Sequence, residues 1–461
     1  MTGFVHAIFA HLKTGADRAP LTDESVIDRL YRRHRLRIML AITIGYGIAY
    51  TCRLALSVVK KPLLDAGVFS VSELGLIGSG LFYAYAFGKL VNGFLADHAN
   101  LKYFFAVGVF VSALINVAMG FNTALVVAVA LWALNGWFQG FGAPAGVVAM
   151  AQWFTASERG RAYGIWSTAH SIGEGLTFLV VAALVSTWGW RAGFWGPGLA
   201  CVVVAIGCVW LMQDRPETLG LPAANQWKAR HVASPGSEVA PPAVPVELPG
   251  DTWNQQKGVL RRPAIWILAL SAGLTYVTRY AINSWGILYL QEARGLSLMQ
   301  AGGVISVNTL SGILGAVSYG FLSDKLFRGR RPPANLLFSV LELAGLGMIF
   351  FAPTASTAFL TFAFFIYGFG LTGLVTSLGG LFAVDIVPRR AAGAVMGFVG
   401  VFSYLAAAVQ ENISGFLIER GVQIVDGVRH YDFSSAITFW LGCTLLSAIL
   451  PATLWRVRAQ S

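Results

Sequence analysis

Residues 41–59, AITIGYGIAYTCRLALSVV, and residues 264–290, AIWILALSAGLTYVTRYAINSWGILYL, decide the fold of this chain. Each stretch is apolar and long enough to cross a membrane as a helix, yet each carries an arginine near its middle, Arg53 or Arg279. Each arginine follows a tyrosine by three residues and precedes an alanine by two, so the two segments are related copies. A charge at that depth costs about 2.5 to 3.5 kcal/mol, so it normally faces a cavity and a partner. Two such cations, one in each half of the chain, predict a central site for a dianion.

The composition of the chain places it in a membrane. Of its 461 residues, 56% are hydrophobic and 12% are charged, whereas an ordinary soluble protein has roughly 25% charged residues. Its apolar runs match the length of about 20 helical residues that a hydrocarbon core requires, and none alternates with period two as a barrel strand would. The predicted fold class is therefore all-α integral membrane. The twelve predicted transmembrane helices are residues 36–60, 72–96, 103–120, 124–153, 159–186, 190–212, 263–291, 298–322, 333–353, 357–385, 391–419 and 434–456.

The basic residues indicate the orientation of the chain. Segments on the side of the N-terminus carry roughly four times as many Lys and Arg residues as segments on the other side, and such loops stay cytoplasmic. We therefore expect both termini to be cytoplasmic, in a bacterial-type inner membrane. The same bias explains the net charge of +11 without a nucleic-acid partner. The N-terminus has no signal-peptide cleavage pattern, so the first span is expected to be retained.

The sequence has few features typical of a metal site, a cofactor site or an enzyme active site. The four cysteines fall within predicted spans without the spacing of metal ligands, so we expect packing residues and neither a disulfide nor a metal site. Neither a nucleotide-binding G-x-x-x-x-G-K-[ST] loop nor an H-E-x-x-H motif occurs. We therefore expect no cofactor and no enzymatic activity.

The chain divides into two similar halves. Its middle is rich in Pro, Ser, Gly and charged residues, as linkers are, with six spans before it and six after it. The tract GFLAD at 93–97 recurs as GFLSD at 320–324, at nearly the offset that separates the two arginines. Such repetition argues for a duplicated six-helix unit. The predicted organisation is a cytoplasmic segment 1–35, a bundle 36–212, a cytoplasmic linker 213–262, a second bundle 263–456 and a cytoplasmic tail 457–461.

The repeated tract carries a family resemblance. G-x-L-x-D followed by basic residues resembles the hallmark loop of the major facilitator superfamily, and the resemblance covers the whole chain. It implies two six-helix bundles related by a pseudo-two-fold axis along the membrane normal, with substrate held between them at midplane. It also implies that the loop acids cap a helix or pair with bases in one of two access states. The expected conformational-switch residues are Asp97, Lys102, Asp324 and Arg328.

More specific strings resemble the organophosphate:inorganic phosphate antiporter family. They include GYGIAYTCR in the first span, LWALNGWFQGFGAP in the fourth, ERGRAYGIWSTAHSIGEG entering the fifth and YVTRYAINSWG in the seventh. The resemblance implies that Arg53 and Arg279 bind phosphate. The chemistry agrees, because a guanidinium presents a fork matched to two oxygens of a phosphate dianion. Such a clamp would draw the halves together, whereas two facing cations in an empty site would resist closure, which predicts obligate exchange.

Lys89 and His170 are the next candidates for substrate binding. Lys89 lies inside the second span with Tyr85 one turn before it, at the family's substrate cavity; the alternative is a lysine that extends to the membrane surface. His170 lies in the A-H-x-x-G context of the family's substrate-site histidine; the alternative is a packed, hydrogen-bonded residue. As an imidazolium it would bind phosphate more tightly at mildly acidic pH.

Three further tyrosines and an asparagine lie near the cationic residues. Tyrosine offers a hydroxyl donor and an apolar face suited to a sugar or glycerol moiety, although a membrane-interface position is the usual alternative for any single tyrosine. An asparagine one turn beyond Arg279 would bind substrate hydroxyls or simply pack. These candidates are Tyr46, Tyr50, Tyr276 and Asn283.

Several positions depart from the family pattern. Leu54 stands where relatives usually follow the first arginine with lysine, and Asn308 stands where the family often has a glutamate. The third departure is Glu174 in the fifth span, at a position where relatives usually have glycine. A buried acid there would need a partner such as His170 or Lys89, and the three would form a neutralised cluster. These departures put the organic part of the substrate in doubt.

The leading hypothesis is a secondary transporter that exchanges a small organophosphate for inorganic phosphate by alternating access. Hexose 6-phosphate and glycerol 3-phosphate are the expected substrate types. The alternative is a non-transporting sugar-phosphate sensor of the same fold that acts on a membrane histidine kinase. A third hypothesis is a carrier of another small anion, such as a carboxylate or phosphonate. The expected partners are these ligands and membrane lipid, together with a membrane histidine kinase if the protein is a sensor. The chain is expected to be a monomer because its site is built within one chain.

Overall fold

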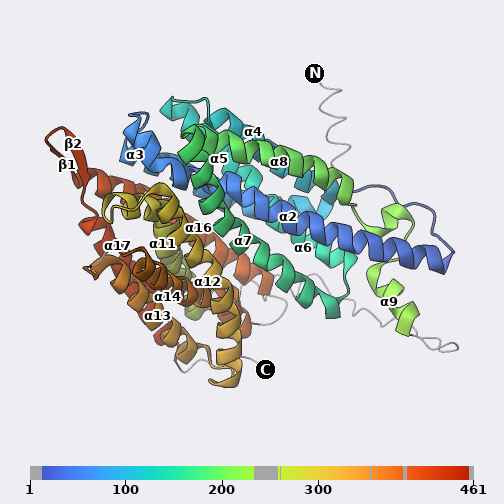
Figure 1. Ribbon diagram of the computed structural model, residues 1–461. Helices are drawn as coiled ribbons and strands as arrows, with labels where there is room; N and C mark the ends of the chain where they lie inside the picture. The colour runs from blue at the N-terminus through green and yellow to red at the C-terminus, as the bar shows by residue number, and fades with distance from the viewer. Residues whose placement is uncertain (1–12, 233–257, 260, 354–355, 388–391, 456–461) are drawn as a thin grey trace.

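The computed structural model describes residues 13–232, 258–259, 261–353, 356–387 and 392–455 (Figure 1). Within these residues, twelve helices are long and apolar enough to cross a membrane. The predicted all-α membrane fold with twelve spans is therefore confirmed. An even number of spans puts the beginning of the first span and the end of the last on one face, which we call the terminal face; the opposite face is the distal face.

The first six spans are built from seven helices, because the fourth span is formed by two consecutive helices. They are α2 (Glu24–Asp65), α3 (Val71–His98), α4 (Leu101–Met119), α5 (Leu125–Gln139) with α6 (Gly142–Trp153), α7 (Ala156–Trp188) and α8 (Ala192–Leu211). A 3-10 turn, η1 (Pro216–Leu219), and a short helix, α9 (Ala224–Val232), follow on the terminal face.

The last six spans repeat this arrangement, and again the fourth of them is interrupted, here by a π-helical turn. They are α11 (Pro263–Glu292), α12 (Leu298–Lys325), α13 (Arg331–Phe351), α14 (Thr357–Thr376) with η2 (Ser377–Leu381) and α15 (Phe382–Asp385), α16 (Ala392–Arg420) and α17 (Ser434–Ala452). A hairpin of β1 (Val422–Val425) and β2 (Val428–Tyr431) joins the last two spans on the distal face.

The helix starts reflect local sequence chemistry. The side chain of Asp23 accepts hydrogen bonds from the backbone N–H groups of Ser25 and Val26, so α2 begins at residue 24, well before the predicted residue 36. The equivalent helices α3 and α12 both begin with a capping box, at Ser70 and at Ser297. The duplication therefore extends to the signals that start the helices.

The two sets of helices meet along three pairs, α3 with α16, α7 with α12 and α2 with α11. In Figure 1 the blue and green helices form one group and the yellow and red helices the other. Glycines allow close approach toward the distal face. A Cβ added at Gly75 of α3 would lie 2.7 Å from the carbonyl oxygen of Glu411, and one at Gly302 of α12 would lie 2.5 Å from that of Phe178. The distal part of the interface is thus packed backbone to backbone.

Part of the predicted linker is folded against the first half. Trp227 of α9 stacks on Tyr31 of α2 with ring centroids 4.4 Å apart, and the Lys228 ammonium lies 3.0 Å from the Glu158 carboxylate. The predicted linker 213–262 therefore begins with a docked segment, while its residues 233–257 lie outside the described residues.

Candidate functional site

A cavity of about 450 Å³ lies between the two halves, in the part of the interface nearer the terminal face. Its walls come from α3, α6 and α7 on one side and from α11, η2 and α16 on the other. Polar and aromatic side chains line part of it, and glycines of α3, η2 and α16 line much of the rest. The lining residues that matter for ligand chemistry are Lys89, Tyr163, Trp166, Tyr276, Ser403 and Tyr404.

Arg53 lies behind this cavity with 3% of its surface exposed. Its guanidinium carbon is 4.1 Å from the ring centroid of Tyr85, 5.2 Å from that of Tyr50 and 5.5 Å from that of Tyr404. Its Nε and Nη2 groups have no hydrogen-bond partner in the described part of the chain. The aromatic faces stabilise the charge but satisfy none of these donors. A buried guanidinium with unsatisfied N–H groups is suited to receive an anion.

Arg279, the second cation, has an acidic partner from the other half. Its Nη2 donates to Glu174 Oε2 at 3.0 Å, and the Asn283 amide donates to the other oxygen of the same carboxylate. The Asn308 amide in turn donates to Asn283 Oδ1 at 3.3 Å. Four residues, each near the middle of α7, α11 or α12, thus form a hydrogen-bonded network.

This network corrects the predicted surroundings of Glu174. We expected its partner to be His170 or Lys89, but Glu174 lies on the face of α7 that packs against the second half, where Ser306 donates to the Gly175 carbonyl at 2.8 Å. His170, one turn earlier, faces α2, with its ring centroid 6.1 Å from that of Tyr50. The predicted neutralised cluster of His170, Lys89 and Glu174 is therefore wrong.

Lys89 and His170 occupy different parts of the site. Lys89 lines the cavity, with Nζ 5.5 Å from the ring centroid of Tyr404. It therefore shares an aromatic neighbour with Arg53. His170 is half-buried, and its Nε2 lies 3.3 Å from Ser171 Oγ. A direct role for either residue in ligand binding stays a prediction.

The predicted tyrosines form a continuous aromatic wall around the cations. The Tyr46 and Tyr50 rings pack edge to face at 5.4 Å, and the Tyr85 ring lies 4.5 Å from that of Tyr404. Tyr276 lines the cavity, with its ring 5.5 Å from that of Tyr404. Three of the four predicted tyrosines, Tyr46, Tyr50 and Tyr85, are less than a tenth exposed, which places them inside the protein rather than at the membrane surface.

Tyr404 and Tyr280 are members of this wall that sequence reasoning missed. Tyr404 lies within 5.5 Å of both Arg53 and Lys89, and Tyr280 lies 5.7 Å from Arg279. Tyr280 directly follows Arg279 in the sequence, a signal that was present. Tyr404 is far from every cation along the chain, so only the packing of α16 on α3 reveals its role.

A buried ion pair closes the interface on the distal side of Arg53. Lys60 Nζ, in a fully buried side chain, lies 3.1 Å from Glu411 Oε2, donates to Ser284 Oγ at 2.6 Å and lies 3.2 Å from the ring centroid of Trp285. A void of about 10 Å³ touches both Arg53 and Glu411, which leaves room for about one water molecule. Lys60, the last residue of the predicted first span, thus belongs to the interior and supplies the partner of the buried acid Glu411.

The predicted switch residues differ between the halves. Asp324 pairs with Arg331 at 3.0 Å, and Arg331 also pairs with Asp385 at 2.7 Å. Arg328 instead lies in the turn after α12, with φ of 54°.

In the first half, Asp97 is exposed, and no ion pair involves it among the residues that the structure places. Lys102 lies 5.4 Å from the ring of its neighbour Tyr103. The backbone N–H of Leu101, at the start of α4, is capped by Asp214 at 3.0 Å. The switching role of Asp97, Lys102, Asp324 and Arg328 stays a prediction.

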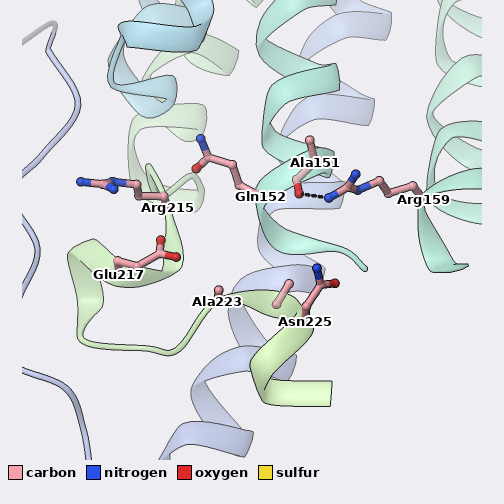
Figure 2. Close-up of a pocket in the computed structure, with 8 residues that line it drawn as sticks. Ala151, Gln152, Arg159, Arg215, Glu217, Ala223 and Asn225 are labelled. Atoms are coloured by element: carbon pink, nitrogen blue, oxygen red, sulfur yellow. Dashed lines mark hydrogen bonds between the residues drawn. The ribbon is translucent and has the colours of Figure 1, made fainter. Parts of the chain in front are cut away.

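A second hollow, of about 300 Å³, lies on the terminal face of the first half (Figure 2). Figure 2 shows Arg159 donating to the carbonyl of Ala151, a hydrogen bond of 2.6 Å, with Arg215 and Glu217 on the far wall. None of the predicted ligand-binding residues lines it. Among the described residues, no group of three or more His, Cys, Asp and Glu side chains is placed to hold a metal ion.

Comparison with known proteins identifies relatives along nearly the whole chain. Residues 37–410 match the family described as Major Facilitator Superfamily. The chain is 38% identical to the membrane sensor protein UhpC of Escherichia coli (strain K12), over 86% of this chain and 89% of that protein. It is 30% identical to a probable hexose phosphate transport protein of Chlamydia trachomatis, over 96% of this chain and 95% of that protein.

A solved structure supports the fold. A bacterial homolog of the human lysosomal transporter Spinster, in an inward-facing and occupied conformation, superimposes with a TM-score of 0.71 at 16% identity. The match covers 92% of this chain and 96% of that one. At this identity the likeness concerns the arrangement of helices.

Proposed function

The chain belongs to the major facilitator superfamily, in its organophosphate:phosphate antiporter branch, and we propose that it exchanges a small organophosphate for inorganic phosphate by alternating access. The observation that carries this proposal is Arg53. Its guanidinium is buried behind a cavity shared by both halves, and two of its nitrogen atoms have no partner among the described residues. Phosphate oxygens would satisfy these donors and compensate the charge.

The charges around the cavity suit a phosphate monoester. Arg53, Arg279 and Lys89 contribute three positive charges and Glu174 one negative charge, so the formal balance is +2 with His170 neutral. A monoester carries close to two negative charges at neutral pH. Arg279 uses Nη2 for Glu174 and keeps other N–H groups for a ligand, because a guanidinium has five donors.

The cavity also suits a small polar molecule. Its volume of about 450 Å³ falls in the range of roughly 300–1,000 Å³ that small-molecule sites occupy. Tyr276 and Tyr404 offer flat apolar faces with hydroxyl donors, the combination that sugar and glycerol moieties require. A hexose 6-phosphate or glycerol 3-phosphate would place its phosphate toward Arg53 and its hydroxyl groups toward the tyrosines.

Alternating access requires that one end of the site be closed while the other is open. The Lys60–Glu411 pair and the close backbone contacts at Gly75 seal the distal end, while the cavity opens toward the terminal face. We assign the terminal face to the cytoplasm from the excess of basic residues there. The conformation is then one that receives substrate from inside the cell.

The test is exchange in proteoliposomes loaded with inorganic phosphate. External labelled phosphate should enter in exchange for internal phosphate, and glucose 6-phosphate or glycerol 3-phosphate should compete. Arg53→Lys should abolish both uptake and competition, because an ammonium replaces the guanidinium fork. Uptake that is indifferent to phosphate esters, or that survives this substitution, would overturn the proposal.

A sugar-phosphate sensor is the second candidate, and the similarity to a membrane sensor protein favours it. A sensor needs the same ligand site but no translocation. Labelled phosphate or glucose 6-phosphate would then bind to the purified protein and lose binding in Arg53→Lys, while proteoliposomes would show no exchange. Its action would require a second protein, and a membrane histidine kinase is the class we expect.

A further inference from the structure

We propose that Glu174 is a resident counter-anion of Arg279 that allows the empty site to change its access. The protein would then move its organophosphate down a gradient without a counter-substrate, in addition to exchange. This inference rests on the proposed transport function. It concerns how transport is coupled, which the identity of the substrate does not determine.

The first argument is the position of Glu174 across the interface. The acid comes from α7 of the first half, whereas Arg279 and Asn283 come from α11 of the second half. Only 2% of Glu174 is exposed, and the side chain of Arg279 is 15% exposed. The pair therefore joins the halves inside the protein, without any ligand.

The second argument concerns charge repulsion in an empty site. Two buried arginines that face each other without counter-ions oppose closure of the site, and a bound phosphate relieves the repulsion. That is the physical basis of obligate exchange in such a design. Here Arg279 keeps a carboxylate when substrate leaves, so the unloaded site lacks one of the two uncompensated cations.

The third argument is that the remaining cations are stabilised in other ways. Arg53 lies on the faces of Tyr50, Tyr85 and Tyr404, and aromatic faces lower the cost of a buried cation. Lys89 lines the cavity and is only partly buried. The empty site therefore contains no bare pair of buried cations, and the barrier to reorientation without substrate should be low.

The test compares net efflux with exchange. Proteoliposomes are loaded with labelled glucose 6-phosphate, and the membrane potential is held at zero with potassium and valinomycin. They are then diluted into buffer with or without inorganic phosphate. For the wild type, we expect net efflux without external phosphate to reach at least about one tenth of the exchange rate, because the barrier differs by no more than about 1.4 kcal/mol.

Glu174→Gln is the decisive variant, since it keeps the shape of the side chain and removes its charge. We expect the ratio of net efflux to exchange, both measured for the same variant, to fall by about tenfold or more, because Arg279 loses its counter-ion. Glu342→Gln is the matched control. Glu342 is also a fully buried membrane glutamate, but it lies on α13, away from the cavity, so its ratio should equal that of the wild type.

Three results would overturn the inference. The first is exchange without net efflux in the wild type, and this measurement does not depend on the folding of any variant. Glu174→Gln could leave the ratio unchanged, or Glu342→Gln could lower it equally. Absence of flux in both modes, with ligand binding retained, would instead remove the transport function on which the inference rests and favour the sensor.

Discussion

Arg53 and Arg279 occupy the same place in the two halves, yet they have different neighbours. Arg53 lies against three tyrosine rings, and no ion pair to it occurs among the described side chains, whereas Arg279 donates to Glu174. The difference comes from the fifth spanning helix of the opposite half. That helix is α16 for Arg53 and brings Tyr404, and it is α7 for Arg279 and brings Glu174. Duplication accounts for the two cations, but the facing helix determines how each is compensated.

The largest expected effect follows from substituting the two arginines separately. Arg53→Lys should weaken phosphate binding by about 30-fold or more, the usual consequence of losing a buried, charge-assisted contact. Arg279→Lys should weaken it less, because Arg279 already shares its guanidinium with Glu174. Equilibrium binding of labelled phosphate to both purified variants measures the difference. Equal losses of phosphate affinity in the two variants would mean that the ligand displaces Glu174 and binds both arginines equally.

The Glu174–Arg279 pair can be broken from either side. Glu174→Gln alone or Arg279→Gln alone should lower the free energy of unfolding by about 1–3 kcal/mol, because each leaves a buried partner unsatisfied. The double variant should recover part of that loss. The Tm of the four proteins in one detergent provides the measurement. Additive losses in the double variant would show that the two side chains do not stabilise each other.

The aromatic neighbours of Arg53 offer a smaller and more selective change. Tyr404→Leu removes the ring and should weaken phosphate binding by about two- to twelvefold, as expected for a cation–π contact of roughly 0.5–1.5 kcal/mol. Tyr404→Phe keeps the ring and should stay close to the wild type. Binding titrations of both variants distinguish the ring from the hydroxyl. A loss as large in Tyr404→Phe would assign the effect to the hydroxyl group.

The smallest effect is expected at Glu342, an acid on which neither arginine depends. Its two carboxylate oxygens have no hydrogen-bond partner among the residues that the structure places. Glu342→Gln should leave phosphate affinity unchanged and should maintain or raise the Tm, because an amide is cheaper to bury than a carboxyl group that ionises. Affinity and Tm are measured under the conditions used for Glu174→Gln. A fall in affinity would show that Glu342 acts on the site from a distance.

The sequence predicted the twelve spans and the location of Arg53 and Arg279 inside two of them, because both signals lie in continuous stretches of chain. The partner of Glu174 was predicted wrongly, since spacing along one helix indicates which residues are one turn apart but not which face meets the other half. The buried pair of Lys60 and Glu411 could not be predicted for a related reason. The two residues are 351 positions apart, so only the packing of the helices shows that they meet.

Two other features were missed for different reasons. Tyr404 has no cation near it in sequence, so its place beside Arg53 depends entirely on how α16 packs. The hairpin of β1 and β2 could have been recognised, because Asp426-Gly427 is a typical hairpin turn and both residues have positive φ, 52° and 76°. Long apolar spans dominate the hydropathy pattern and conceal so short an element.

The location of Glu174 and Arg279 on different halves also limits how the halves can be recombined. In a chimeric gene, the second half of this chain joined to a first half with glycine at position 174 would contain Arg279 without its carboxylate. The reverse chimera would join the first half of this chain, with Glu174, to a second half that has a glutamate at the position of Asn308. Its site would then contain two acids. The two halves are therefore a matched set rather than interchangeable modules. A chimera that contains this second half should keep a glutamate at position 174 of its first half.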